Sequence, residues 1–327
     1  MLKKLNMDKF RILCAIFIIA IHTYPFVTVN QNLEIIFTHI ICRVGVPFFL
    51  MITGYFVLPK AINNKQKLVE YTKKILKMYI LCILLYLPVN IYSGNISNSI
   101  LEIIKDIFMN GTFYHLWYFP ALILGIWIVY YLIKKLNKKT IVTILLVLYI
   151  IGLFGDSYYK LGNSINFVSL FYNVIFNIFD YTRNGLFYTP IFLYLGYAFN
   201  TRKLKIKNSL VLFIISLILM IIEGLIINHY HIQKHDSMYI MLIPVMIFLF
   251  SLILNTSTSN NKKLRNLSTI IYIIHPLIIV LVRLLSKVFS LEIMVTNSLV
   301  HFVLVTILSI LFSIIYEKIK SKLLKLN

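Results

Sequence analysis

The chain has 327 residues, of which 60% are hydrophobic and 13% are charged, and its mean hydropathy is +0.86. Soluble domains are about 45–50% apolar and about 25% charged, so this composition excludes a soluble, fibrous or disulfide-scaffold protein. The formal net charge is +21. Because the bases stand in short clusters between apolar runs, they indicate orientation in a membrane and contact with a lipid bilayer, with no nucleic acid as partner.

A membrane-spanning helix needs about 20 mostly apolar residues. The sequence predicts an all-α polytopic membrane protein with about ten transmembrane helices in a single domain, residues 1–327. No internal repeat and no oligomeric state is indicated. The predicted spans, in chain order, are 10–29, 35–58, 73–91, 117–133, 140–155, 186–199, 209–228, 239–254, 268–289 and 295–317.

Most of the lysines and arginines fall in every second connecting segment. Since cytoplasmic segments carry the excess of basic residues, this alternation predicts that both termini are cytoplasmic. We expect a multi-pass protein of a bacterial plasma membrane, without a cleavable signal. The basic clusters are residues 3–11, 60–77, 134–139, 202–207, 262–265 and 318–325.

Two outer segments are longer than a connection requires. Residues 92–116 carry isoleucines at helical spacing, which predicts a helix lying in the membrane interface. Residues 156–185 are rich in Asn, Tyr and Phe, and we expect them to cap an outward cavity.

The first span contains Arg11 and His22, which lie on one helical face about 16 Å apart along the axis. Arg11 is near the cytoplasmic surface, where it is either an anchor at the membrane edge or a ligand-binding group. His22 lies in the outer half of an otherwise apolar helix. An ionisable side chain within a span is costly, so His22 is a candidate for the functional site.

The second span carries Arg43 about 12 Å below its outer end, close to the depth of His22. A permanent cation near a histidine disfavours the imidazolium and keeps the ring neutral, as a general base requires. Gly45, Pro47 and Gly54 either open the helix for a thin ligand or permit close helix packing.

Polar residues also occur in the seventh and ninth spans. Tyr272 and His275 share a face of the ninth span, and His275 is expected in its inner half, where a structural role or a cytosolic ligand is favoured. Glu223 in the seventh span either pairs with Arg43 or Arg183 or polarises His22.

The outer segments contain two further candidate groups. His115 and Trp117 belong either to an aromatic belt at the interface or to the rim of a polar substrate site. His229, His231 and His235 have a spacing that could bind a metal, but a solvated loop is favoured and no metal is expected.

Four motifs carry a resemblance to a known family. Asp8, Arg11 and His22 form the first, and the second is Gly45-Val46-Pro47-Phe48-Phe49 followed by Thr53-Gly54-Tyr55. The others are His115-Leu116-Trp117-Tyr118 and the segment from Ser268 to Pro276. Together they resemble the acyltransferase family 3 membrane proteins. Cys14 stands where the family usually has Ala, and Thr53 stands for its Ser.

Within that family, the chain is most similar to the membrane domain of the vancomycin-resistance serine racemases. The likeness is carried by Thr182-Arg183-Asn184-Gly185-Leu186-Phe187, by Pro190-Ile191-Phe192 and by Pro244-Val245. Those proteins continue into a soluble racemase domain that depends on pyridoxal phosphate. We expect no racemisation by residues 1–327, which are either a stand-alone relative or the membrane half of a racemase system.

The resemblance implies an acyltransferase that moves an acyl group, usually acetyl, from cytosolic acyl-CoA to an extracytoplasmic acceptor such as a cell-envelope glycan or another small polar molecule. Acyl-CoA is then a co-substrate, and the depth argument pairs His22 with Arg43. The alternative is a transporter of a small polar solute such as L-serine, since buried charges also suit a carrier. The predicted site comprises, as catalytic residues, His22, Arg43 and Glu223; for CoA, Arg11, Lys73, Lys74, Lys77, Tyr272 and His275; and for the acceptor, His115, Trp117, Arg183 and Asn184.

Overall fold

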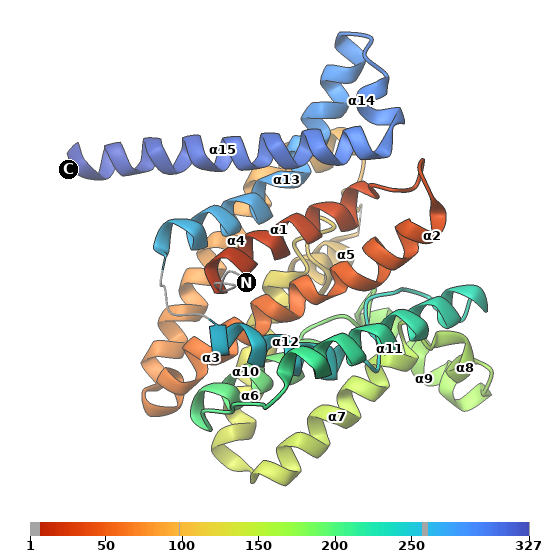
Figure 1. Cartoon of the computed structure of the whole chain (residues 1–327), viewed down its shortest axis with the longest axis vertical. Helices are drawn as coiled ribbons and strands as arrows, with labels where there is room; N and C mark the ends of the chain where they lie inside the picture. Colours follow the sequence, from red (N-terminus) through yellow and green to blue (C-terminus); the bar gives the residue numbers. More distant parts are fainter. Residues whose placement is uncertain (1–6, 98, 257–260, 327) are drawn as a thin grey trace. The chain divides into compact units, whose positions relative to one another are not determined.

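The computed structural model describes residues 7–97, 99–256 and 261–326, and within them it contains helices, turns and loops but no strand (Figure 1). The predicted all-α class is therefore confirmed for these residues. The inner bases Lys3 and Lys4 and both chain ends lie outside the described residues.

The helices follow one another with short connections. Their bounds are α1 Met7–Thr23, α2 Gln31–Glu34, η1 Ile35–Ile40, η2 Ile41–Val44, α3 Gly45–Asn63, α4 Lys65–Ser93, α5 Ile100–Lys105, η3 Asp106–Asn110, α6 Tyr118–Lys135, α7 Lys138–Phe154, α8 Tyr159–Asn163, α9 Asn166–Ile178, α10 Thr189–Thr201, α11 Ser209–His229, α12 Leu242–Thr256, α13 Lys262–Val288, α14 Ile293–Thr296 and α15 Ser298–Leu326.

Six helical segments of the described chain are long and apolar enough to cross a membrane, which makes this a helical membrane protein. The predicted count of ten spans is not confirmed. The helices at four predicted spans, α1, α7, α10 and α12, have only 17, 17, 13 and 15 residues, fewer than the about 20 that a span needs. The six segments are 31–63, 65–93, 118–135, 209–229, 262–288 and 298–323.

The chain divides into two compact units, which we describe separately. Unit 1 comprises residues 1–48, 206–225 and 244–327, and unit 2 comprises residues 49–205 and 226–243. The boundaries fall inside helices, since α3, α11 and α12 each contribute to both units. The expected single domain stays a prediction.

Unit 1 is organised around α13, which packs against α1 and α15 (Figure 1). Ala15 and Ile19 of α1 meet Ile271 and Val282 of α13 and Val305 of α15 in a buried cluster. In a bilayer the lipid tails are as apolar as these side chains, so close packing rather than exclusion of water holds such helices together. This contact fixes α1 beside the middle of α13.

Unit 2 is organised around α6, which packs against α4, α7 and α10. The part of α3 that belongs to this unit crosses α10 with the two backbones in contact. A Cβ atom added to Gly54 would overlap the carbonyl oxygen of Leu193, and one added to Gly196 would overlap that of Met51. Gly54 therefore permits close helix packing, which is one of the two interpretations that its sequence context allowed.

The outer segments differ from the predictions in one respect. Residues 92–116 contain α5 and η3, a short helical stretch that leaves Ile100 and Phe108 exposed, as expected of an interfacial helix. Residues 156–185 were expected as a capping loop, but they contain the 13-residue helix α9. Its apolar side chains recur at Phe167, Leu170 and Val174, a helical spacing that the high content of Asn and Tyr obscured.

Candidate active site

Two histidines from different helices lie side by side in unit 1. The rings of His22 in α1 and His275 in α13 are nearly parallel, with centroids 5.4 Å apart and planes inclined by 21°. His275 is fully buried, whereas His22 is only partly buried. The predicted catalytic residue therefore has a neighbour, and the more accessible ring of the pair is His22.

The proline that follows His275 determines how this ring is held. Pro276 has no backbone N–H, so the carbonyl of Tyr272 one turn earlier loses its helical donor. The Nδ1 atom of His275 lies 2.8 Å from that carbonyl oxygen and 3.3 Å from the carbonyl oxygen of Ile271. A carbonyl only accepts, so Nδ1 carries the proton and the lone pair of the neutral ring is on Nε2.

The sequence placed His275 in the inner half of its span, and this depth in the membrane stays a prediction. The helix α13 begins at Lys262, six residues before the predicted start, and His275 is at the middle of the helix. His275 lies beside His22, which belongs to the C-terminal part of α1. The ring of Tyr272, another predicted ligand-binding residue, lies 6.2 Å from that of His275.

The N-terminal end of α1 is also joined to the start of α13. Asp8 is buried, and its Oδ1 lies 3.6 Å from Nε of Arg11. Its Oδ2 accepts a hydrogen bond of 2.6 Å from the backbone N–H of Asn261, and the Asn261 side chain in turn caps the N-terminus of α13. The carboxylate thus holds Arg11 and the start of α13 in one place.

Arg43 lies where the helix from 31 to 63 departs from α geometry. Residues 35–40 form a π-helix and residues 41–44 a 3₁₀-helix, and such irregular turns often occur at functional sites. Both segments pack against α1. Gly45 contacts the backbone at Cys14, and the ring of His39 lies 5.9 Å from that of Tyr24. Arg43 lies between these two contacts in sequence, and its Nε donates a hydrogen bond of 3.4 Å to the carbonyl of His39. Its proximity to His22 stays a prediction.

A second polar cluster lies in unit 2 and contains two of the predicted acceptor-binding residues. The guanidinium carbon of Arg183 lies 4.3 Å from the ring centre of Tyr181 and 5.3 Å from that of Trp117. Arg183 also donates a hydrogen bond of 3.2 Å to the hydroxyl of Ser237. The aromatic faces and the hydroxyl fix the direction of this cation.

Asn184 and His115 lie close to this cluster in sequence but contribute to the protein interior. The side-chain oxygen of Asn184 accepts from the N–H groups of Leu186 and Phe187, and its amide donates to the carbonyl of Tyr181. These bonds shape the turn that carries Arg183. His115 is buried among aromatic rings, the nearest being Tyr86 at 4.9 Å. Contact of either residue with an acceptor stays a prediction.

A model for the family described as "Acyltransferase domain" matches residues 4–318. The chain belongs to this family. It is 39% identical to an amino-acid racemase of Enterococcus faecalis over 97% of this chain and 45% of that protein. It is 36% identical to a serine/alanine racemase of Enterococcus gallinarum over 98% of this chain and 47% of that protein. No solved structure matches the chain.

Both predicted likenesses, to the acyltransferase family and to the vancomycin-resistance type of racemase, are therefore confirmed. This acyltransferase-family chain spans about half the length of the curated relatives it matches. Family membership supports a membrane acyltransferase in general terms. The acyl donor, the acceptor and the role of each residue are proposals.

The other predicted site residues lie apart from the histidine pair in sequence and belong to different helices. Lys73, Lys74 and Lys77 are exposed along α4 of unit 2. Glu223 is half-buried in the part of α11 that belongs to unit 1. Its pairing with a particular arginine, or with His22, stays a prediction.

Sequence reasoning missed Asp156, whose contacts support the Arg183 cluster. Asp156 is fully buried in the turn after α7, and its Oδ1 accepts hydrogen bonds from the N–H groups of Ser237 and Met238 and from the Ser157 hydroxyl. Burial raises its pKa to about 6, although the two backbone N–H groups and nearby Arg183 favour the charged form. A lone acid directly after an apolar run was the available signal.

The three cysteines, Cys14, Cys42 and Cys82, are buried as free thiols. Among the described residues no group of three His, Cys, Asp or Glu side chains is arranged to hold a metal ion, and this includes the outer-loop histidines.

Proposed function

We propose that this protein is a membrane acyltransferase that takes an acyl group, usually acetyl, from cytosolic acyl-CoA and transfers it to the hydroxyl or amine of an extracytoplasmic acceptor. The acceptor is a cell-envelope glycan or another small polar molecule. The observation that carries the proposal is the parallel pair of His22 and His275 in a chain of the acyltransferase family. A partly accessible imidazole beside a fully fixed one suits proton transfer.

In this reaction His22 is the general base. It removes the proton from the acceptor oxygen or nitrogen as this atom attacks the thioester carbon. The tetrahedral intermediate carries a negative oxygen, which Arg43 stabilises in surroundings of low dielectric constant. The carbon–sulfur bond then breaks, and the proton on His22 passes to the CoA sulfur. His275 is the positioning residue, because its Nδ1–H is fixed by the carbonyl of Tyr272.

The remaining predicted residues have assigned roles in this proposal. Arg11, held by Asp8 near the inner end of α1, meets a phosphate or the pantetheine arm of CoA. Arg183 and Trp117 recognise the acceptor on the outer side, where a cation between two rings suits a carboxylate or a sugar hydroxyl. Glu223 polarises the site or pairs with a cation.

The test uses the purified chain in lipid nanodiscs with acetyl-CoA and a panel of acceptors, and it measures release of the CoA thiol. General-base catalysis contributes about 10²–10⁴-fold, so His22→Gln is expected to lose at least about a hundredfold in kcat while it still binds CoA. Arg11→Ala is expected chiefly to weaken CoA binding. The matched control is His229→Gln, at the exposed end of α11. Full turnover in His22→Gln would contradict the proposal.

A second candidate function is favoured by the names of the relatives, which are an amino-acid racemase and a serine/alanine racemase. The chain would then be the membrane half of a racemase system or a carrier for a small polar amino acid such as L-serine. Uptake of labelled L-serine into proteoliposomes without CoA would support this function, and its dependence on Arg183 would locate the solute site.

We further propose ten transmembrane segments, with both termini on the cytoplasmic side of a bacterial plasma membrane. The alternation of basic clusters supports this topology. A cysteine introduced at Lys139 is expected to be shielded from a membrane-impermeant maleimide added outside intact cells, whereas one introduced at Tyr230 is expected to react.

A further inference from the structure

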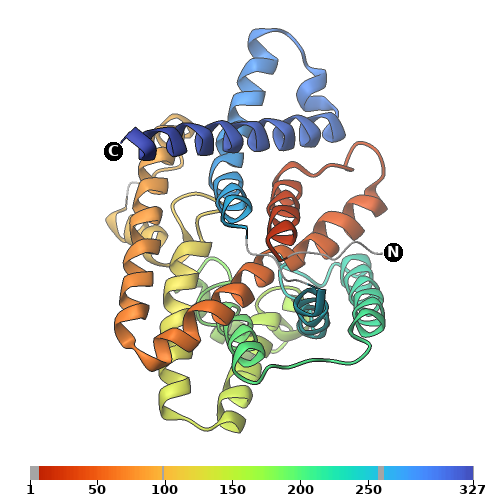
Figure 2. The same ribbon diagram turned by 60° about the vertical axis from the view of Figure 1, so that its left-hand side comes forward.

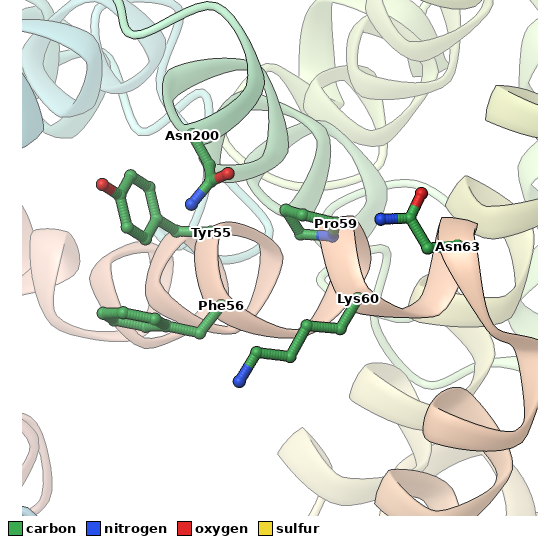
Figure 3. Close-up of a pocket in the computed structure, with 6 residues that line it drawn as sticks. All are labelled: Tyr55, Phe56, Pro59, Lys60, Asn63 and Asn200. Carbon is green, nitrogen blue, oxygen red and sulfur yellow. The ribbon is translucent and has the colours of Figure 1, made fainter.

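Unit 2 contains a pocket of about 260 Å³ between α3 and the end of α10 (Figure 3). Tyr55, Pro59 and Asn63 project from α3 at intervals of four residues, toward Asn200 of α10. Two more residues of α3, Phe56 and Lys60, complete the lining on the adjacent side of the helix. Six residues from two helices thus line one concave site, and in this view the side chains of Phe56 and Lys60 point away from Asn200.

The pocket exists because of the helix crossing described above. At Gly54 and Gly196 the two backbones are in contact, so the helices cannot approach further. Asn200 lies one turn beyond Gly196, on the same face of α10, and Tyr55 directly follows Gly54. Beyond the crossing the helices diverge, and side chains rather than backbone fill part of the space between them.

The lining combines a cation, two carboxamides and two aromatic rings. Lys60 supplies an ammonium group, and Asn63 and Asn200 each supply N–H donors. The rings of Tyr55 and Phe56 meet edge to face, with centroids 4.9 Å apart. Among the residues that the structure describes, no acidic side chain lines this pocket. Such a set suits an anion with several acceptor oxygens that is attached to a flat ring.

The surroundings strengthen the preference for an anion. The α3–α4 turn carries Lys65 and Lys67, and Arg202, Lys203 and Lys205 follow α10. The acid nearest in sequence to the α3–α4 turn, Glu70, forms an ion pair of 3.0 Å with Lys67. The turns α3–α4 and α6–α7 lie toward the same end of unit 2 in both views, so their lysines gather at one end (Figures 1 and 2). A cluster of positively charged side chains creates a positive potential that attracts phosphates.

We propose that this pocket binds the nucleotide end of the acyl-CoA donor, with Lys60, Asn63 and Asn200 at a phosphate and the rings of Tyr55 and Phe56 against the adenine. The ligand's identity rests on the proposed function. Pockets that bury a drug-sized ligand measure about 300–1,000 Å³, so a pocket of about 260 Å³ holds only part of CoA. Lys73, Lys74 and Lys77, which the sequence indicated for the phosphates, do not line it.

An anionic lipid headgroup also carries a phosphate, and it would meet the same lysine. It has no flat base, however, and the two aromatic side chains would then have no partner in the ligand. The lining therefore favours the nucleotide, and the experiment distinguishes the two ligands.

The experiment measures the Kd for CoA by isothermal titration calorimetry, with the full chain in nanodiscs of neutral phosphatidylcholine. Lys60→Gln and Asn200→Asp are each expected to raise Kd at least about tenfold, because one loses a cation and the other places a negative charge at the phosphate. The matched control is Lys160→Gln, an exposed lysine of α8, with an expected change below about twofold.

Activity provides a second readout. With acetyl-pantetheine, which lacks the nucleotide, Lys60→Gln is expected to have the kcat/KM of the unaltered protein, whereas with acetyl-CoA its KM is expected to rise. Because acetyl-pantetheine turnover also demonstrates correct folding, a variant that merely unfolds is recognised at once.

Three outcomes would overturn the inference. If the unaltered chain binds CoA and both variants bind it equally well, only the pocket assignment fails. If the unaltered chain binds no CoA, the proposed function fails as well. The third outcome concerns phosphatidylglycerol, followed by native mass spectrometry. If this lipid stays bound to the unaltered chain but is lost from Lys60→Gln, while both proteins bind CoA with the same affinity, the pocket is a lipid site.

Discussion

The buried carboxyl of Asp156 allows a quantitative prediction. The substitution Asp156→Asn keeps the shape of the side chain and an oxygen that accepts hydrogen bonds from the N–H groups of Ser237 and Met238. It removes the carboxyl group that binds and releases a proton. Burial raises the pKa of Asp156 from 3.8 to about 6 in the folded protein. Arg183 and Asp236 are the charged groups whose fields act on it there.

The sign and size follow from linkage between proton binding and folding. A raised pKa means that the folded state binds this proton more tightly than the unfolded chain, so the ionised form costs folding stability above pH 6. One pKa unit corresponds to about 1.36 kcal/mol, so the cost is about 3 kcal/mol at pH 7. It is expected to decline as the pH falls from about 6 and to disappear below pH 3.8, where Asp156 is protonated in both states.

The assay is unfolding in a non-ionic detergent at pH values between 4 and 7.5, followed by fluorescence of the two tryptophans, Trp117 and Trp127. Trp117 lies beside Arg183, whose hydroxyl partner Ser237 is held by Asp156, so its emission reports on this region. Other groups titrate equally in both proteins. The difference in unfolding free energy between Asp156→Asn and the unaltered protein therefore isolates Asp156. It is expected to grow by about 2–3 kcal/mol in favour of Asp156→Asn between pH 4 and pH 7. A difference independent of pH would refute the reasoning.

Two further substitutions test the helix geometry. Pro276→Ala supplies a backbone N–H that competes with His275 for the carbonyl of Tyr272. The loss of one hydrogen bond on His275 is expected to lower kcat about three- to tenfold and to leave the KM for acetyl-CoA unchanged. Equal kcat values would contradict this role of Pro276, and the control is Pro88→Ala in α4. Gly196→Ala forces a Cβ into the carbonyl of Met51, and a destabilisation of about 1–3 kcal/mol in chemical unfolding is expected, against none for Thr201→Ala at the exposed end of α10. An unaltered unfolding free energy would show that α3 and α10 are not in backbone contact.

Long apolar runs make much of this fold predictable from sequence. The segments 65–93, 209–229 and 298–323 are apolar enough that composition alone indicates a span. The π-helical and 3₁₀ turns before Gly45 are not predictable in this way, since no residue in 35–44 is a proline or glycine that would mark a break. They depend on packing against α1.

The site was only partly predictable, for a related reason. His22, Arg43 and Arg183 attract attention because a polar residue in an apolar helix is costly. Their neighbours are found only in the folded chain. Asp156 reaches the backbone of Ser237 across 81 residues of sequence, and no periodicity indicates such a contact. The start of α13 was placed six residues too late, because the Asn261 cap that sets it precedes the apolar run.

The contacts between α1 and α13 explain the spacing in the first motif. Asp8 binds the backbone of Asn261, and His22 stacks on His275, so both contacts join residues 253 positions apart. Equal offsets at both ends mean that the two helices run parallel and in step over 14 residues, about 21 Å. An insertion of one residue between Arg11 and His22 would rotate His22 by about 100° away from His275 while the Asp8 contact stayed in place. The separation between Asp8 and His22 thus matches the distance along α13 from its N-cap, Asn261, to His275.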